Sequence, residues 1–264
     1  MRMLTLPAGV LAGCISIAAS PAAGQDTLEG QIGAGVGIGP EYEGADAYKP
    51  IPIVPLSLRY KGFGLQTAGQ GLQLDVSGIR FIDFGPILQY RGGRDDDVDD
   101  PVVALLPEVD PAIEVGGFVA INLPFFFPGT DAFTFIGRAS FDVADGHGGL
   151  LVEPALRYSL PIGDDLRLNF IGGTTFVTEN YNETYFGVSQ AASELSGLPG
   201  FDAGSGFKDV TGTFAMNYFF AEHWGLTGIF RVTRLVGDAA DSPIVQDRGS
   251  PTQFLGGVAV TYRF

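Results

Sequence analysis

Alternation of apolar and polar residues is the sequence feature that most constrains how this chain folds. In the last segment, residues 254–264, apolar side chains stand at nearly every second position, with small or polar ones between them. The same period of two recurs along most of the chain, in segments of about 10–14 residues. Successive side chains of a strand point to opposite faces, so each segment predicts a strand with one apolar face. Segments of this length are typical of tilted membrane strands, because strands in soluble sheets average about 5–6 residues.

The number of strands follows from counting these segments and from parity. The alternation identifies segments that start near residues 28, 51, 63, 79, 111, 132, 148, 165, 207, 223 and 252. Bacterial single-chain barrels have an even number of strands, so one strand is missing from the count. The phase breaks between residues 61 and 78, where Gly69-Gln70-Gly71 indicates a turn or a bulge. We therefore predict an all-β, antiparallel transmembrane β-barrel of about twelve strands over residues 25–264, with about ten as the alternative.

The first 24 residues have the pattern of a signal peptide. Arg2 precedes an apolar run from residue 4 to 19, and small residues follow up to Gly24. The run is too short for a membrane-spanning helix of about 20 residues, and we expect cleavage after Gly24 and export. An alternative is a lipobox at residues 11–14, in which Cys14 would be lipidated. Ordinary cleavage removes Cys14, the chain's one cysteine, and leaves no disulfide or thiol site.

Charge and hydropathy restrict the class of protein further. The formal net charge of −15 argues against nucleic-acid binding, which needs a basic surface. The mean hydropathy of +0.22 is high for an acidic chain that has no later run of 18 apolar residues, and a barrel surrounded by outer-membrane lipid explains both facts. A soluble lipocalin-like barrel is the alternative, since alternation does not say which face is outside. Aromatic residues at segment ends favour the membrane, where they form an interfacial girdle. They are Tyr60, Tyr90, Tyr158, Tyr218, Trp224, Tyr262 and Phe264.

The polar face of the strands predicts a charged lumen. Charges of both signs suggest mutual pairing, because unpaired charges away from water are unfavourable. The lumen is then either a wet, narrow pore or a space filled by a charge network, and a barrel of this size does not decide between them. The predicted lumen charges are Glu114, Arg138, Glu153, Arg157, Arg167, Asp209 and Arg231.

Long connections at about 91–110, 178–206 and 237–251 fall on one side by strand parity, which we expect to be the cell exterior. Connection 178–206 is too apolar for a free surface loop. We interpret it as a plug that folds into the lumen, or as a recognition surface. Its candidate residues are Tyr181, Tyr185, Phe186, Leu195 and Leu198. At the other end, Tyr262 and Phe264 predict a C-terminal signal for the barrel-assembly machinery.

Catalytic and metal sites find little support in the sequence. The two histidines, His147 and His223, are predicted at opposite ends of the barrel, so they do not share a site. We interpret both as polar turn residues and expect no catalytic residues, cofactor or metal. A hydrolase at the rim that uses His147 is the alternative. The acidic run 95–100 lacks EF-hand spacing and is interpreted as a solvated loop. Its alternative role is to bind divalent cations that bridge lipopolysaccharide phosphates.

Several connection sequences resemble those of a known family. They are Pro40-Glu41-Tyr42-Glu43-Gly44, residues 184–188, 196–199, 202–210 and 235–245, and the ending Tyr262-Arg263-Phe264. In this order and spacing they resemble the MipA/OmpV family of outer-membrane proteins over essentially the whole exported chain. The resemblance implies a non-enzymatic envelope scaffold that links a lytic murein transglycosylase to a penicillin-binding protein. Resemblance to other members of the family implies a porin-like or osmotically regulated protein, so a narrow channel for small solutes, or a role in osmoregulation, is the alternative.

Overall fold

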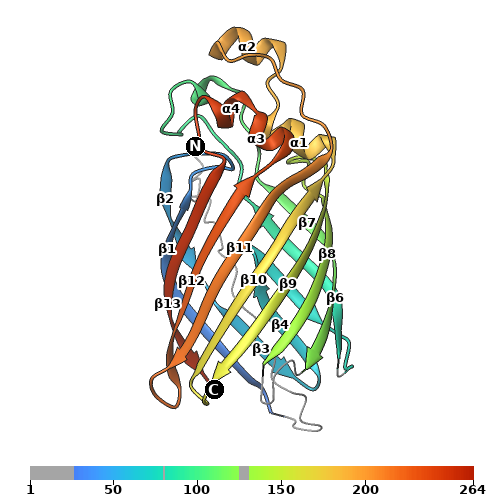
Figure 1. Cartoon of the computed structure of the whole chain (residues 1–264), viewed down its shortest axis with the longest axis vertical. Helices are drawn as coiled ribbons and strands as arrows, with labels where there is room; N and C mark the ends of the chain where they lie inside the picture. Colours follow the sequence, from blue (N-terminus) through green and yellow to red (C-terminus); the bar gives the residue numbers. More distant parts are fainter. Residues whose placement is uncertain (1–26, 80, 125–130) are drawn as a thin grey trace, which may run out of the picture.

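The computed structural model describes residues 27–79, 81–124 and 131–264, and within these ranges the chain forms a closed antiparallel β-barrel (Figure 1). Strands pair in chain order from β1 (Glu29–Pro40) round to β13 (Thr252–Arg263). The ring closes where β13 pairs with residues 31–38 of β1. Closure leaves no free sheet edge among the described strands, which a sheet crossing a lipid bilayer requires.

The second strand of the ring is broken into two pieces. Residues 35–40 of β1 pair with β2 (Tyr48–Ile53), and residues 29–32 pair with β3 (Leu56–Tyr60). Pro55 lies in the break, and proline has no N–H to give to a ladder. Counting β2 and β3 as one strand, the described residues form the predicted barrel of twelve strands. The strands after β5 are β6 (Ile82–Arg91), β7 (Ala112–Pro124), β8 (Ala132–Asp142), β9 (Leu150–Ile162), β10 (Leu166–Val177), β11 (Gly206–Phe219) and β12 (Trp224–Leu235).

The strand that the alternation did not reveal is β5 (Gly71–Asp75). It pairs with β4 (Phe63–Ala68) through a turn at Gly69 and Gln70, with Ala68 opposite Gly71. Gly69 has a φ of +62°, a backbone conformation that glycine adopts at low cost. The phase break is therefore a tight turn between two short strands and not a bulge. This turn is why the count of segments came one short.

Large apolar side chains cover the outer surface of the barrel. On β1, Ile32, Val36 and Ile38 are exposed, whereas Gln31, on the opposite face of the strand, points inward and is buried. The other strands repeat this arrangement, which is the reverse of a soluble barrel and fits lipid contact. Of the predicted girdle, Tyr90 and Tyr158 are half-buried. The exposed members lie at the end of the barrel that holds the C-terminus, and are Tyr60, Tyr218, Trp224, Tyr262 and Phe264.

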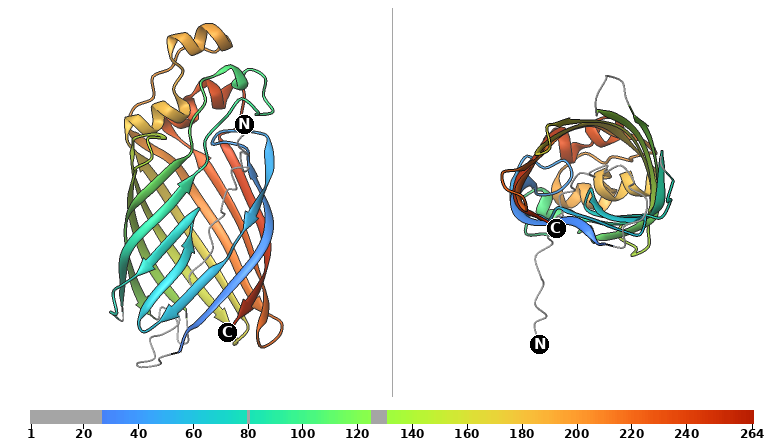
Figure 2. Two further views of the ribbon diagram at one scale, coloured as in Figure 1. Left: turned by 180° about the vertical axis from the view of Figure 1, so that it is seen from behind. Right: turned by 90° about the horizontal axis from the view of Figure 1, so that it is seen from below.

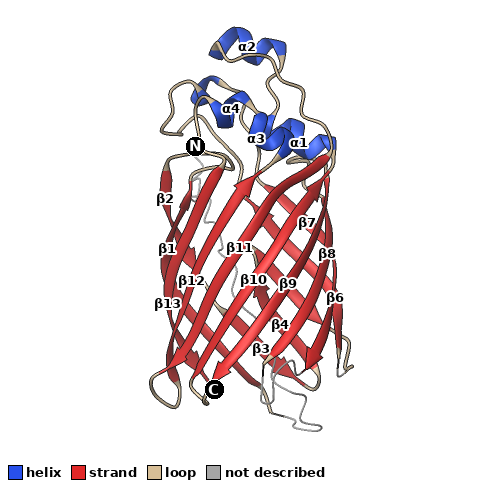
Figure 3. Cartoon of the chain, viewed as in Figure 1, coloured by secondary structure: helices blue, strands red, loops and turns tan. Residues whose placement is uncertain are grey.

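The two ends of the barrel differ in the length of their connections (Figure 3). Every described helix lies at one end, here called the capped end, as the strand parity predicted for the long connections. The opposite end, here called the C-terminal end, has short turns at the positions described. The helices are η1 (Val103–Leu105), α1 (Glu179–Phe186), α2 (Gln190–Ser196), α3 (Gly237–Asp241) and α4 (Pro243–Gln246). None of the helices in the described part of the chain is long and apolar enough to cross a bilayer.

The predicted signal peptide, residues 1–24, and Cys14 within it lie outside the described residues. The predicted barrel domain, residues 25–264, begins in the described part with β1 and forms one continuous ring.

Candidate functional site in the lumen

The capped end is closed by a packed layer of side chains. Seen from below, the helices lie across the ring (Figure 2). Tyr181 and Phe186 of α1 are fully buried and pack against barrel and loop residues such as Val177 and Val245. Leu198 belongs to a second buried cluster with Tyr42 and Ile244. Tyr185 is also buried, so four of the five residues predicted for this connection lie inside the cap.

Leu195 is the exception among the predicted cap residues. It lies on α2, which extends beyond the rest of the cap in Figure 1, and 68% of the residue is exposed. Leu195 therefore takes no part in closing the barrel.

A β-bulge places two charged residues side by side in the lumen. Thr175 of β10 pairs with Asp209, but the next residue, Phe176, pairs with Phe207. Lys208 is thus the extra residue of the bulge. Regular alternation would point Lys208 towards lipid, yet Lys208 and Asp209 are both only 4% exposed. Their side chains approach each other, with 3.2 Å between Lys208 Nζ and Asp209 Oδ2.

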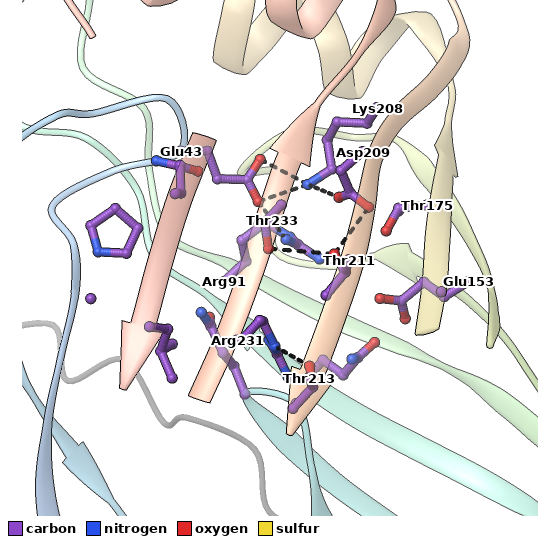
Figure 4. Close-up of a pocket in the computed structure, with 18 of the residues that line it drawn as sticks. Glu43, Arg91, Glu153, Thr175, Lys208, Asp209, Thr211, Thr213, Arg231 and Thr233 are labelled. Atoms are coloured by element: carbon purple, nitrogen blue, oxygen red, sulfur yellow. Dashed lines mark hydrogen bonds and ion pairs between the residues drawn. The ribbon is translucent and has the colours of Figure 1, made fainter. Parts of the chain in front are cut away.

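Glu43 is the centre of a charge cluster beneath the cap (Figure 4). Lys208 Nζ donates to both carboxylate oxygens, at 2.9 and 3.0 Å, and Arg91 Nη1 donates at 2.9 Å. The hydroxyl of Tyr181 donates a further hydrogen bond of 2.8 Å. Burial alone would raise the pKa of Glu43, but the charges of Lys208 and Arg91 outweigh it and lower that pKa to about 2. Glu43 is therefore ionised at neutral pH. We call Glu43, Arg91, Tyr181, Lys208 and Asp209 the Glu43 cluster.

Arg91 connects the Glu43 cluster to a second buried carboxylate, Glu114. Glu114 is fully buried and accepts a 2.6 Å hydrogen bond from Arg91 Nε and one of 3.2 Å from Ser140 Oγ. His147 Nε2 lies 3.2 Å from the same carboxylate. The imidazole also meets the ring of Tyr181 edge-on, with centroids 4.8 Å apart.

His147 lies in the connection between β8 and β9, at the end of the barrel opposite His223, as predicted, but it is not exposed. Its imidazole is buried under the cap between Glu114, Tyr181 and Tyr185, so His147 is a turn residue that also packs into the cap. With 4% of the residue exposed, His147 presents almost no surface to solvent. His223 lies at the C-terminal end, where it is exposed and its Nδ1 is 2.9 Å from the carbonyl oxygen of Arg263. Among the described residues, no group of three His, Cys, Asp or Glu side chains is arranged to hold a metal ion.

The seven predicted lumen charges occupy inward positions of their strands, and two of them pair with cations outside the predicted set. Glu114 pairs with Arg91 and Asp209 pairs with Lys208, two cations that the alternation did not select. Arg138 of β8, with Glu153 and Arg157 of β9, lies farther down the lumen. Of the remaining two, Arg231 donates from Nε to Thr213 Oγ1 at 3.1 Å, and Arg167 is on β10.

Cavities of different size lie along the barrel axis. One of about 300 Å³ is lined at its upper part by the charged members of the Glu43 cluster and lower down by Arg138, Glu153 and Arg157. Arg138 and Arg157 also line a smaller cavity of about 40 Å³, together with Arg59. Arg59 in turn lines a pocket of about 460 Å³ at the C-terminal end, with Glu222, His223 and Phe264.

The residues missed from the sequence are Glu43, Arg91 and Lys208. Glu43 belongs to a connection and Arg91 ends a strand, so alternation does not assign either to the lumen. The adjacent charges Lys208 and Asp209 at a strand start were a usable signal for a bulge. The acidic run 95–100 has a structural role in part, since Asp100 accepts hydrogen bonds from Arg248 and from the backbone of η1.

Comparison with known proteins adds the family. Residues 32–264 match the family model described as MltA-interacting protein MipA. The chain is 31% identical over 123 residues to the MltA-interacting protein of Escherichia coli K12, which covers 47% of this chain and 48% of that protein. It is 29% identical over 126 residues to the putative outer membrane protein YiaT of the same strain, covering 48% of this chain and 50% of that protein. The chain thus spans about half the length of the curated relatives it matches.

Solved structures with a related outline have low sequence identity to this chain. The translocator domain of the autotransporter NalP from Neisseria meningitidis is 12% identical, with a TM-score of 0.44 over 91% of this chain and 90% of that one. OmpT of Vibrio cholerae is 6% identical, with a TM-score of 0.37 over 90% of this chain and 98% of that one. The family model, in contrast, matches nearly the whole described chain, and the protein belongs to the MipA family of outer-membrane β-barrels.

Proposed function

We propose that this protein is a non-enzymatic interaction protein of the outer membrane, which binds a lytic transglycosylase at its C-terminal end in the periplasm. The observation that carries the proposal is the contrast between the two ends. The capped end is filled by buried side chains such as Tyr181 and Phe186, whereas the C-terminal end holds an open pocket of about 460 Å³. The name of the Escherichia coli relative, MltA-interacting protein, supports this class of partner.

The pocket at the C-terminal end has the chemistry of a docking site. Its lining combines Arg59, Glu29 and Glu222 with the aromatic side chain of Phe264. Charged groups around an apolar anchor are typical of protein recognition surfaces. Arg263 is held in place beside the pocket, because its guanidinium donates to the carbonyl of Glu222 at 2.9 Å and lies 4.1 Å from the ring centroid of Phe219.

The orientation belongs to the same proposal. Export by the signal peptide of residues 1–24 and insertion by the barrel-assembly machinery, through Tyr262 and Phe264, place the C-terminal end in the periplasm. The capped end and its acidic run then face lipopolysaccharide. A penicillin-binding protein would be a second partner, joined through the transglycosylase.

A binding measurement tests the proposal. The protein is refolded in detergent, and its affinity for purified Escherichia coli MltA is measured by biolayer interferometry. We expect Arg59→Glu to weaken binding about tenfold or more, as loss of a charged contact at the centre of an interface does. Arg234→Glu is the matched control, because it makes the same charge change at an exposed position near the capped end. Equal effects of both variants, or no binding by the folded wild type, would contradict the proposal.

A narrow channel is the second candidate function, and the lumen cavity of about 300 Å³ supports it. The cap then acts as the gate. We expect the wild type to give no conductance steps in a planar bilayer and a variant without residues 178–206 to give discrete steps. Steps from the intact wild type that change with Arg157→Gln would favour transport over the interaction role.

A further inference from the structure

We propose that the lumen contains a binding site for a small oxyanion that still carries an acidic hydroxyl, of the inorganic phosphate class, between Arg138, Arg157 and Glu153. The site lies away from the pocket proposed to bind a transglycosylase, and it stands or falls independently of that function. Arg138 projects from β8 and Arg157 from β9, and both line the cavities above and below them.

The two arginines have hydrogen-bonding capacity that nothing in the described chain uses. Arg157 is only 5% exposed, and its one hydrogen bond runs from Nη2 to Thr134 Oγ1 at 3.2 Å. Arg138 Nη2 makes a long bond of 3.4 Å to Gln73 Oε1. The Nε atoms of both arginines are buried and have no hydrogen-bond partner among the described residues. A guanidinium has five N–H donors in a planar fork, and its buried donors are stabilised best by an anionic acceptor.

The charge of the cavity favours an anion, although the protein as a whole is strongly acidic. Among the described residues that line the lumen cavity of about 300 Å³, six side chains are cationic and four are carboxylates, a surplus of two positive charges. The whole chain has a formal net charge of −15. Carboxylates from the loops pair with the upper cations, as Glu43 does with Lys208 and Arg91. No described carboxylate forms an ion pair with Arg138 or Arg157 within 4.0 Å.

Glu153 determines which anion fits. It is the cross-strand neighbour of Arg138, and its Oε2 is buried without a hydrogen-bond partner in the described chain. Figure 4 shows Glu153 among the side chains that line this cavity. A carboxylate repels a fully deprotonated anion but accepts a hydrogen bond from an acidic hydroxyl. Hydrogenphosphate has both parts, with oxygens for the arginines and a hydroxyl for Glu153. Sulfate has no hydroxyl at neutral pH, so the site discriminates against it.

The lining residues also indicate a route to the site. Arg138 and Arg157 share the small cavity below them with Arg59, and Arg59 lines the pocket at the C-terminal end. Arginine side chains therefore occur at each step from that end to the site, together with Asp75 and Asp83 in the small cavity. At the capped end, the buried side chains of Tyr181 and Phe186 occupy the space above the cavity.

Isothermal titration calorimetry tests this proposal on the whole protein, refolded in detergent and checked by heat-modified gel migration. Sodium phosphate, sulfate and chloride are titrated at pH 7 and matched ionic strength. We expect saturable phosphate binding, about tenfold or more tighter than sulfate binding, because a charge-assisted contact contributes that much to affinity. Arg157→Gln should weaken phosphate binding about tenfold or more. Arg234→Gln, which removes one cation outside the lumen, should leave it unchanged.

Glu153→Gln gives a second, independent readout. We expect this variant to bind phosphate and sulfate with more similar affinities than the wild type does, because an amide no longer repels sulfate. The anion selectivity of Glu153→Gln tests the proposed site even if Arg157→Gln does not fold. Absence of phosphate heat in the folded wild type, equal affinity for phosphate and sulfate, or equal losses in Arg157→Gln and Arg234→Gln would overturn the proposal.

Discussion

The upper and lower parts of the lumen both contain charged side chains, but these differ in how they are paired. Near the capped end, each charge of the Glu43 cluster meets an opposite charge within 3.2 Å. Towards the C-terminal end, Arg138 and Arg157 face Gln73 and Thr134 instead. The difference lies in where partners come from. Glu43, Tyr181 and His147 belong to connections that fold in from the capped end, whereas the described turns at the other end are too short to reach inward.

The apolar neighbours of the lower arginines sharpen this comparison. Inward positions around them are occupied by a cluster of buried apolar residues that includes Ile87, Phe118 and Ile136. A barrel wall made only of alternating strands places such residues next to charges without pairing the charges. Loops that enter the lumen can bring a carboxylate to a cation, and a ligand can do the same. The comparison therefore predicts that Glu43 and Glu114, near the cap, stabilise the fold, whereas Glu153, farther down, serves binding.

The largest expected effect is that of Glu114→Gln. Glu114 is fully buried, and loss of its charge leaves Arg91 and His147 without their shared partner. Breaking a buried ion pair from one side costs about 3–5 kcal/mol of stability. Glu153→Gln makes the same chemical change in the lower half, and we expect it to cost less than about 1 kcal/mol because no ion pair is lost. Urea unfolding in detergent, followed by the fluorescence of Trp224, measures both. Equal losses would remove the distinction between the two halves.

Glu43→Gln should have the next largest effect, and its effect should depend on pH. The pKa of Glu43 is lowered from 4.5 to about 2, so its ionised form stabilises the folded state at all pH values above 4.5. That contribution is about 3 kcal/mol at most, and it is lost as the pH falls from about 4.5 through about 2. Wild type and Glu43→Gln should therefore differ at pH 7 and converge near pH 2. A difference that stays constant over this range would mean that the lowered pKa is not the cause.

Alternation predicted the strands, the closed ring and the inward positions of residues such as Arg138 and Glu153. A period of two assigns each residue to one face of its strand, whatever strands lie beside it. It failed where the backbone leaves that period. Lys208 turns inward only because of the bulge opposite Thr175, and β5 was hidden by the turn at Gly69. Partners that come from connections, above all Glu43, depend on tertiary folding of the cap. No local pattern in the sequence carries that information.

A smaller effect is expected from Tyr181→Phe. The hydroxyl of Tyr181 donates to Glu43 at 2.8 Å, but Glu43 keeps both cationic partners when the hydroxyl is removed. Loss of one hydrogen bond of this kind costs about 1 kcal/mol. The ring remains, so contact with His147 and the closure of the cap are preserved. We expect a lower urea midpoint and no conductance steps in a planar bilayer. Steps from this variant would mean that the hydroxyl, and not the packed ring, keeps the barrel closed.

The smallest effect is expected from Arg248→Gln, which tests whether burial or mere pairing stabilises the capped end. Arg248 and Asp100 form a close pair, with 2.6 Å between Nη2 and Oδ2, but the arginine side chain is 33% exposed. Water already stabilises both groups in the unfolded chain, so an exposed pair contributes little to stability. Salt separates the two cases further, because the loss in Arg248→Gln should shrink as ionic strength rises, while that in Glu114→Gln should not. If salt reduces the stability losses of both variants equally, then water reaches Glu114 and the cap does not shield it from solvent.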